Sequence, residues 1–139
     1  MIERQKEIER LLRSLPAENT EGIVPATNEQ IETFREKCQE FGVDSIVVEQ
    51  LVDFYSIANN FMYEVVFGFH SCTDELIFEW WEDGELWLGQ RDFNTLRWAD
   101  GKFCLGDAGS ISYSQENEYD SLVDLIKGCI KEINELDEI

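Results

Sequence analysis

Two short segments of this chain are near copies of each other, and both have the composition of a β-hairpin. The first, from Trp81 to Gly89, has the sequence WEDGELWLG, and the second, from Trp98 to Gly106, has the sequence WADGKFCLG. Each places Asp-Gly between apolar and aromatic residues. This is a strong local signal for a hairpin, because a type I′ turn needs positive φ at both central residues. Two such hairpins in succession predict an antiparallel meander.

The second hairpin has one consistent register. A two-residue turn at Asp100-Gly101 pairs Trp98 with Phe103, and therefore also pairs Leu96 with Leu105. Opposite partners share one face of a sheet, so this register collects large apolar side chains on a single side. That side is the predicted core face.

The first hairpin is compatible with two registers. A two-residue turn pairs Trp81 with Leu86. A three-residue loop that ends at Gly84 pairs Trp80 with Leu86 instead. In both registers Trp87 points away from the apolar face of its strand, which makes Trp87 a candidate contact residue. The alternative is that Trp87 packs beneath a loop or helix on the second face, because aromatic residues are normally buried.

Helical periodicity surrounds the predicted strands. Apolar residues recur at spacings of three or four in four segments, which are 1–16, 27–42, 45–58 and the stretch from about 118 to 136. Pro16 ends the first segment, and a capping box at Thr27-Asn28-Glu29-Gln30 begins the second, which Gly42 ends. We expect the second helix to cover a face of the sheet and to neighbour the third.

Short β-branched and aromatic runs lie between the third and fourth helices. They predict strands at 64–69, 75–81, 85–88, 93–98, 102–105 and 110–114. Grouped helices, then strands, then a helix predict an α+β fold, a twisted antiparallel meander with the helices packed mainly on one face. At 139 residues with no linker, the chain is expected to be one domain, 1–139.

Charge narrows the classes of partner. The formal net charge is −19, which repels the phosphates of nucleic acids and the surfaces of anionic membranes. We therefore expect no nucleic-acid and no membrane partner, whereas a basic protein would be attracted over long range. The alternative is that the acidity only supports solubility.

No catalytic, metal or cofactor motif stands out. The lone His70 lies two residues before Cys72, but no nucleophile signature surrounds the pair, so a hydrolase is the least favoured function. No cysteine spacing indicates zinc, and no glycine-rich loop enters a helix, so we expect no catalytic site, metal or cofactor. Four cysteines predicted to be free core thiols are Cys38, Cys72, Cys104 and Cys129.

Targeting signals are not recognisable. The stretch from Met1 to Arg13 is highly charged and lacks the apolar core of a signal peptide, and no stretch approaches the length of a membrane span. We therefore expect a cytoplasmic, reduced protein. The oligomeric state is left open.

Three passages resemble the SUKH superfamily, the Smi/Knr-like proteins that include many bacterial immunity proteins. The stretch from Thr27 to Gly42 is similar to the family's opening helix. The stretch from Val48 to Phe61 is similar to its helix with Leu, Phe-Tyr and an Asn-rich turn. The stretch from Leu105 to Ser110 is similar to its Leu-Gly-Asp passage before a C-terminal helix. The resemblance covers residues 25–133. Val43-Asp44-Ser45 stands where the family often has a Leu-Pro step.

The resemblance implies an α+β protein without enzymatic activity that binds other proteins, commonly to neutralise a cognate secreted toxin. An acidic inhibitor suits a toxin with a basic cleft, such as a nuclease. The leading interpretation is an immunity protein that binds through the exposed side of its sheet. The alternative within the family is an intracellular regulatory module that is not tied to a toxin. The candidate partner-binding residues are Trp80 and Trp87 as anchors, with Glu82, Asp83, Glu85 and Asp92 for charge complementarity.

Overall fold

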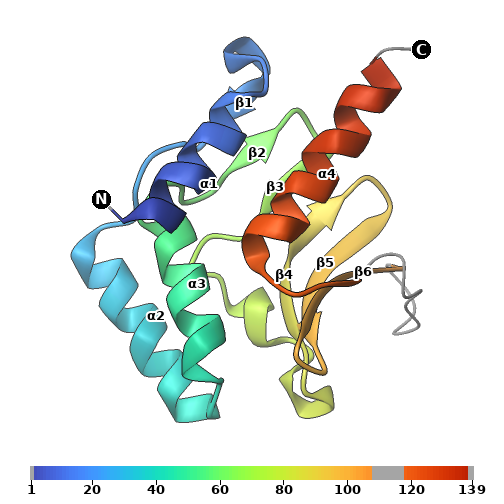
Figure 1. Cartoon of the computed structure of the whole chain (residues 1–139). Helices are drawn as coiled ribbons and strands as arrows, with labels where there is room; N and C mark the ends of the chain where they lie inside the picture. Colours follow the sequence, from blue (N-terminus) through green and yellow to red (C-terminus); the bar gives the residue numbers. More distant parts are fainter. Residues whose placement is uncertain (1, 108–117, 138–139) are drawn as a thin grey trace.

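The computed structural model of the chain describes residues 2–107 and 118–137 and confirms the α+β architecture (Figure 1). The seven strands in these residues form one antiparallel meander, in which each strand pairs with its neighbours in sequence. In chain order the elements, with η marking a short 3-10 helix, are α1 (Glu3–Arg13), η1 (Ala17–Asn19), β1 (Thr20–Glu21), α2 (Asn28–Phe41), α3 (Ser45–Tyr55), β2 (Met62–Tyr63), β3 (Phe67–Phe69), η2 (Glu75–Phe78), η3 (Trp81–Asp83), β4 (Leu86–Arg91), β5 (Asn94–Ala99), β6 (Lys102–Asp107), β7 (Glu118–Tyr119) and α4 (Leu122–Asp137).

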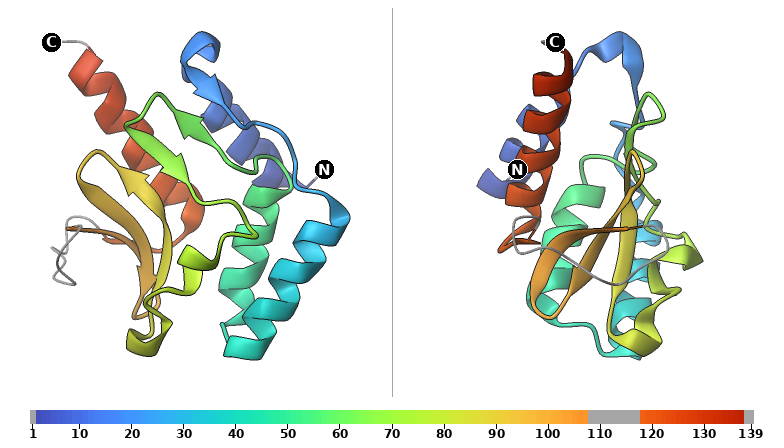
Figure 2. Two further views of the ribbon diagram at one scale, coloured as in Figure 1. Left: turned by 180° about the vertical axis from the view of Figure 1, so that it is seen from behind. Right: turned by 90° about the vertical axis from the view of Figure 1, so that its right-hand side faces the viewer.

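The helices lie mainly on one face of the sheet. Figure 2 shows α1 and α4 side by side on this face, and α3 packs against α1. The second helix, α2, was expected to cover the sheet, but it packs against α3 instead. The reason is that α3 is buried on nearly all sides and stands between α2 and the rest of the core, with Phe34 meeting Tyr55 edge to face at 5.3 Å between ring centroids.

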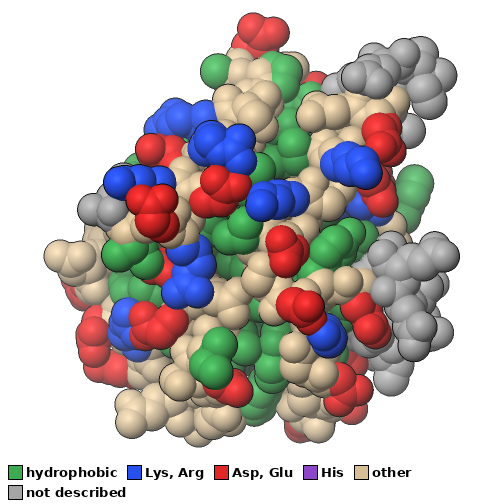
Figure 3. All heavy atoms as spheres, in the orientation of Figure 1, with side chains coloured by type: hydrophobic (Ala, Val, Ile, Leu, Met, Phe, Trp, Pro, Cys, Tyr) green, Lys and Arg blue, Asp and Glu red, His purple; other side chains and the backbone are tan. Residues whose placement is uncertain are grey.

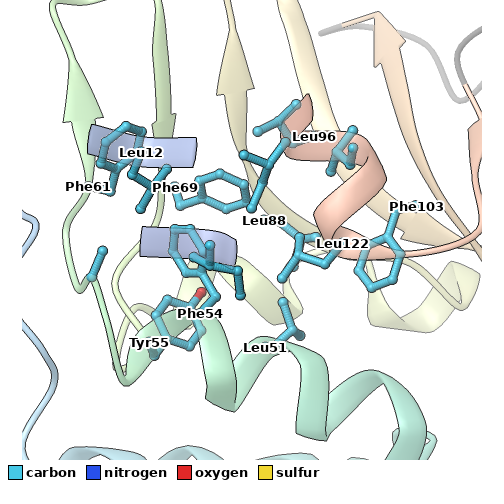
Figure 4. Packing of buried hydrophobic residues seen from close by; sticks show 14 of the residues in the cluster. Leu12, Leu51, Phe54, Tyr55, Phe61, Phe69, Leu88, Leu96, Phe103 and Leu122 are labelled. Atoms are coloured by element: carbon cyan, nitrogen blue, oxygen red, sulfur yellow. The ribbon is translucent and has the colours of Figure 1, made fainter. Parts of the chain in front are cut away.

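One apolar core joins these layers (Figure 4). Phe54 of α3 lies against Phe69 of β3, with ring centroids 4.4 Å apart. Burying such side chains removes apolar surface from water, which stabilises the fold by roughly 25 cal/mol for each Å² buried. Residues drawn from every layer and fully buried there include Leu12, Leu51, Phe61, Leu88, Leu96 and Leu122.

The predicted boundaries of α2 are confirmed by its caps. Gln30 donates its backbone N–H to the Thr27 hydroxyl, and Thr27 donates its own to the Gln30 side chain. Gly42 follows the helix with a φ of 77°, the left-handed conformation that glycine adopts most easily. Both ends of α2 therefore follow from local sequence.

The second hairpin is confirmed together with its register. Asp100 and Gly101 have φ values of 53° and 78°, as a type I′ turn requires. Strands β5 and β6 pair Trp98 with Phe103. They also pair Leu96 with Leu105, as predicted.

The first predicted hairpin is wrong. Residues 75–83 form η2 and η3 rather than a strand, and Leu86 pairs with Trp98 instead of with Trp80 or Trp81. Gly84, at a φ of 78°, donates its N–H to the carbonyl oxygen of Trp81 and so ends a helical turn. An Asp-Gly pair supplies positive φ for a helix cap as readily as for a hairpin turn.

Three further elements differ from the sequence prediction. The predicted strand 64–69 is interrupted by a turn at Glu64, which has a φ of 50°, so that β2 and β3 form a small hairpin. Strand β1 lies between the first two predicted helices, where no strand was predicted, and β7 occupies the expected start of the last helix. The predicted strand 110–114 lies outside the described residues.

Candidate protein-binding surface

Two consecutive tryptophans point in opposite directions and fix the η2–η3 segment to the rest of the fold. The ring of Trp80 stacks on Trp87 of β4, with centroids 4.5 Å apart and planes 21° apart. The indole N–H of Trp81 donates to the carbonyl oxygen of Phe41, at 3.0 Å. The segment therefore lies between strands β4–β6 and the α2–α3 pair, where the yellow-green turns appear in the left view of Figure 2.

A buried ion pair supports the tryptophan stack. Arg97 is only 1% exposed, and its Nη1 donates to Oε1 of Glu85 at 2.8 Å. The guanidinium carbon of Arg97 also lies 3.9 Å from the ring centroid of Trp80, and its Nε donates to the Thr95 hydroxyl. The cation thus holds the Trp80 ring through a cation–π contact while it neutralises a carboxylate.

This arrangement corrects the role expected for Glu85. A surface carboxylate was expected there, but Glu85 is 5% exposed and faces Arg97 beneath the tryptophans. Trp87 pairs with Arg97 on the face opposite the core, as its alternation predicts. It is half-buried, because Trp80 covers one side of its ring and His70 meets it edge to face at 4.7 Å. The alternative prediction, that a loop buries Trp87, is therefore partly right, because Trp80 of the η2–η3 segment covers one side of the ring.

The remaining predicted residues separate into two places. Glu82 and Asp83 are exposed on η3, next to the tryptophan stack in sequence. Asp92 is also exposed but lies at the far end of β4, where its backbone N–H donates to Val66. The structure therefore brings Trp80 and Trp87 together, keeps Glu82 and Asp83 exposed on the η3 turn that follows Trp80, and leaves Asp92 apart.

Sequence reasoning missed an aromatic groove between the end of α2 and the η2–η3 segment. Phe41 and Phe78 stack there with ring centroids 4.8 Å apart, and Trp81 completes the apolar lining. Phe41 shares the helical spacing of the apolar residues in segment 27–42, yet it is 38% exposed. The cavity has a volume of about 420 Å³, and its other lining residues are Lys37, Glu75, Glu79 and Glu82. We call this cavity the aromatic groove.

Positive charge is distributed unevenly over the chain. No Lys or Arg occurs from Cys38 to Gln90, and this stretch contains the acidic-aromatic segment, Asp74–Glu85, with the sequence DELIFEWWEDGE. By contrast, Lys and Arg side chains of α1 and α4 lie among carboxylates on the face shown in Figure 3. The η2–η3 segment therefore contributes carboxylates but no cation of its own to the surface.

The environment of His70 and Cys72 does not favour a nucleophilic pair. Cys72 is 3% exposed, and burial raises the pKa of its thiol, which keeps the sulfur protonated and weakly nucleophilic. Burial lowers the pKa of His70, while the Asp74 carboxylate, 3.7 Å from Nδ1, opposes that shift. All four cysteines are free and buried, as predicted.

Two further kinds of site can be tested on the described residues. Within residues 2–107 and 118–137, no group of three His, Cys, Asp or Glu side chains could hold a metal ion. None of the helices in these ranges combines the length and the apolar composition needed to cross a membrane. Comparison of the chain with protein-family models, curated proteins and solved structures finds no significant match.

Proposed function

We propose that this protein is a non-catalytic immunity protein that neutralises a cognate secreted bacterial toxin by direct binding. The observation that carries the proposal is the acidic-aromatic segment, which two tryptophans and two short 3-10 helices hold in one conformation at the surface. The resemblance to the SUKH superfamily supports the same function. A basic nuclease domain is the class of toxin that such a surface suits best.

Aromatic and acidic groups at one surface are suited to binding a basic protein. Aromatic side chains dominate the energetics of protein interfaces, and carboxylates around them steer and select a positively charged partner. Trp80 and Trp87 supply half-buried aromatic surface, and Glu82 and Asp83 supply exposed charge on the η3 turn that follows Trp80. We propose these four residues as the centre of the contact.

A rigid binding segment also lowers the cost of association. Ordering a mobile loop on binding costs free energy, so a segment that is already fixed retains more of its contact energy as affinity. Here the Trp80 ring stacks on Trp87 and also contacts the Arg97 guanidinium, and Trp81 is hydrogen-bonded to α2. The free protein therefore already presents its binding conformation.

A capture experiment from the native organism tests this function. The tagged protein is used as bait at about 0.1 M salt and washed at about 1 M salt, which shortens the Debye length from about 10 Å to about 3 Å. We expect one large secreted protein with a basic C-terminal domain to elute in the wash and to be identified by mass spectrometry. Recovery of housekeeping partners alone, or of none, would instead favour the regulatory module.

Matched variants locate the contact in the same experiment. Glu82→Gln with Asp83→Asn removes two exposed charges from the η3 turn that follows Trp80, and Glu82 also lines the aromatic groove. Glu18→Gln with Glu21→Gln removes two exposed charges from the η1–β1 region and serves as the control. We expect the first double variant to capture less of the toxin and the control to capture as much as the wild type. Equal loss in both would mean that only net charge matters.

A further inference from the structure

The aromatic groove combines an apolar floor of aromatic side chains with a rim of carboxylates. Phe41 and Phe78 stack nearly parallel, at an interplanar angle of 24°, and Trp81 is held beside them by its hydrogen bond to Phe41. Glu75, Glu79 and Glu82 lie on the rim, and all three are exposed. An apolar floor under three carboxylates suits a ligand that has both a flat apolar surface and a positive charge.

The local backbone adds to the negative potential. The groove lies at the C-terminal end of α2, where the aligned peptide dipoles of a helix place a partial negative charge. Lys37 is the one cation among the lining residues, and its Nζ is 4.0 Å from Oε1 of Glu75. Within the described residues, neither Glu79 nor Glu82 forms an ion pair with a Lys, Arg or His side chain. The groove therefore retains uncompensated negative charge.

We propose that the aromatic groove holds one arginine side chain of the basic partner, an inference that rests on the proposed function. A guanidinium is planar and weakly hydrated, so it stacks on aromatic rings while its N–H groups reach carboxylates at the edge. A lysine ammonium is compact and strongly hydrated and gains less from an aromatic floor. An acidic or phosphorylated side chain is repelled by the rim.

Such a contact gives the interface an anchor separate from the Trp80–Trp87 stack. Arginine is among the residues most often responsible for binding energy when it fills a well-packed aromatic pocket. Trp81 connects the two places, since it follows Trp80 directly and turns toward α2. The acidic-aromatic segment therefore offers the partner stacked aromatic surface on one side and a pocket for a cation on the other.

The inference is tested with small probes on the whole protein. N-acetyl-arginine amide is titrated while the four tryptophan indole N–H signals are followed by NMR, with the Trp81 signal assigned from the Trp81→Phe variant. We expect the Trp81 signal to shift most, because this indole lines the groove. The lysine analogue should bind more weakly, and the neutral citrulline analogue should leave Trp81 unshifted at the same concentrations.

Charge variants give the second measurement. Glu75→Gln with Glu79→Gln should lower the affinity for the arginine probe by about tenfold, because the double variant neutralises two carboxylates of the groove. Both side chains are exposed, so the variant should remain folded, and Glu18→Gln with Glu21→Gln is again the control. Equal shifts with the lysine probe, no shift at Trp81, or an unchanged affinity in the groove variant would overturn the inference.

The probes keep the two proposals separable. If the bait captures a basic toxin but the arginine probe does not shift Trp81, the groove assignment fails while the immunity function stands. If Trp81 responds as expected and no toxin is recovered, the groove is an arginine site and the immunity function loses its support. A toxin whose binding is unaffected by the groove variant would also argue against an arginine in the groove.

Discussion

The buried ion pair of Arg97 and Glu85 makes a prediction that tests the support of the outer sheet face. Arg97→Met keeps much of the side-chain volume but removes the cation that faces Glu85 and covers Trp80. The variant leaves the Glu85 carboxylate in a site that is 5% exposed without this cation. We expect a large loss of stability and a freer Trp80 ring.

The magnitude follows from the geometry. Nη1 and Oε1 are 2.8 Å apart, and two unit charges at that distance attract by about 6 kcal/mol at an effective dielectric constant of about 20. Much of this attraction offsets the cost of removing both charges from water. Removing one partner of a buried pair costs about 3–5 kcal/mol, because the other charge stays buried. We therefore expect Arg97→Met to lower the free energy of unfolding by about 3–5 kcal/mol.

A double-mutant cycle separates charge from packing. The variants Arg97→Met, Glu85→Gln and their combination are unfolded with urea and followed by circular dichroism and tryptophan fluorescence. The double variant should be more stable than the sum of the single losses predicts by about 2 kcal/mol or more, because it buries no uncompensated charge. The exciton signal of the stacked Trp80 and Trp87 rings should weaken in both Arg97 variants.

Two results would refute this reasoning. One is a loss below about 1 kcal/mol for Arg97→Met, which is the range of an exposed pair. The other is additivity of the two single losses to within about 0.5 kcal/mol, which is the behaviour of independent sites. In either case the tryptophan stack would owe its order to packing alone.

Two further predictions concern a glycine and the single histidine. A Cβ at Gly22, which has a φ of 81°, would lie 2.2 Å from the carbonyl oxygen of Asn60, whereas a Cβ at Gly42, which has a φ of 77°, would meet open space. Gly22→Ala should therefore lower the free energy of unfolding by well over the about 1 kcal/mol expected for Gly42→Ala. Urea unfolding compares the two variants, and equal losses of stability would contradict the clash. Burial lowers the pKa of His70 in the folded protein below its ordinary 6.5, so the unfolded chain binds a proton more readily than the folded protein does. The free energy of unfolding should therefore fall as the pH drops below about 6.5, with a slope of at most about 1.4 kcal/mol per pH unit. Unfolding of wild type and His70→Gln at several pH values measures that difference, and parallel pH profiles would contradict it.

Much of the fold could be predicted because its signals are local. The hydroxyl of Thr27 and the amide of Gln30 are three residues apart, so the capping box needs no tertiary context. The same holds for Asp100-Gly101, whose turn fixes the pairing of Trp98 with Phe103 through a few residues on each side. Where the determinant lies within one turn of the chain, the sequence is sufficient.

The first Asp-Gly pair shows where local signals stop deciding. Asp83-Gly84 and Asp100-Gly101 are alike in sequence, yet Asp100 has positive φ whereas Asp83 belongs to a 3-10 helix. The difference comes from the residues before the turn. Trp80 and Trp81 are held on different elements. The backbone there closes a helical turn, in which Asp83 and Gly84 donate their N–H groups to the carbonyl oxygens of Trp80 and Trp81.

The binding surface depends on contacts between residues far apart in sequence, and this is why only part of it could be predicted. Alternation along β4 was enough to place Trp87 on the face away from the core. It could not indicate that Arg97, twelve positions from Glu85, would contact the Trp80 ring and pair with the Glu85 carboxylate, so that Glu85 does not contribute to the surface charge. In the same way, Phe41 follows the apolar periodicity of its helix, but it becomes a wall of the aromatic groove because Phe78 of η2 stacks on it. In a chain this rich in carboxylates, composition predicts that a basic partner is attracted, whereas the few cations and aromatic rings in the fold determine where the uncompensated charge lies.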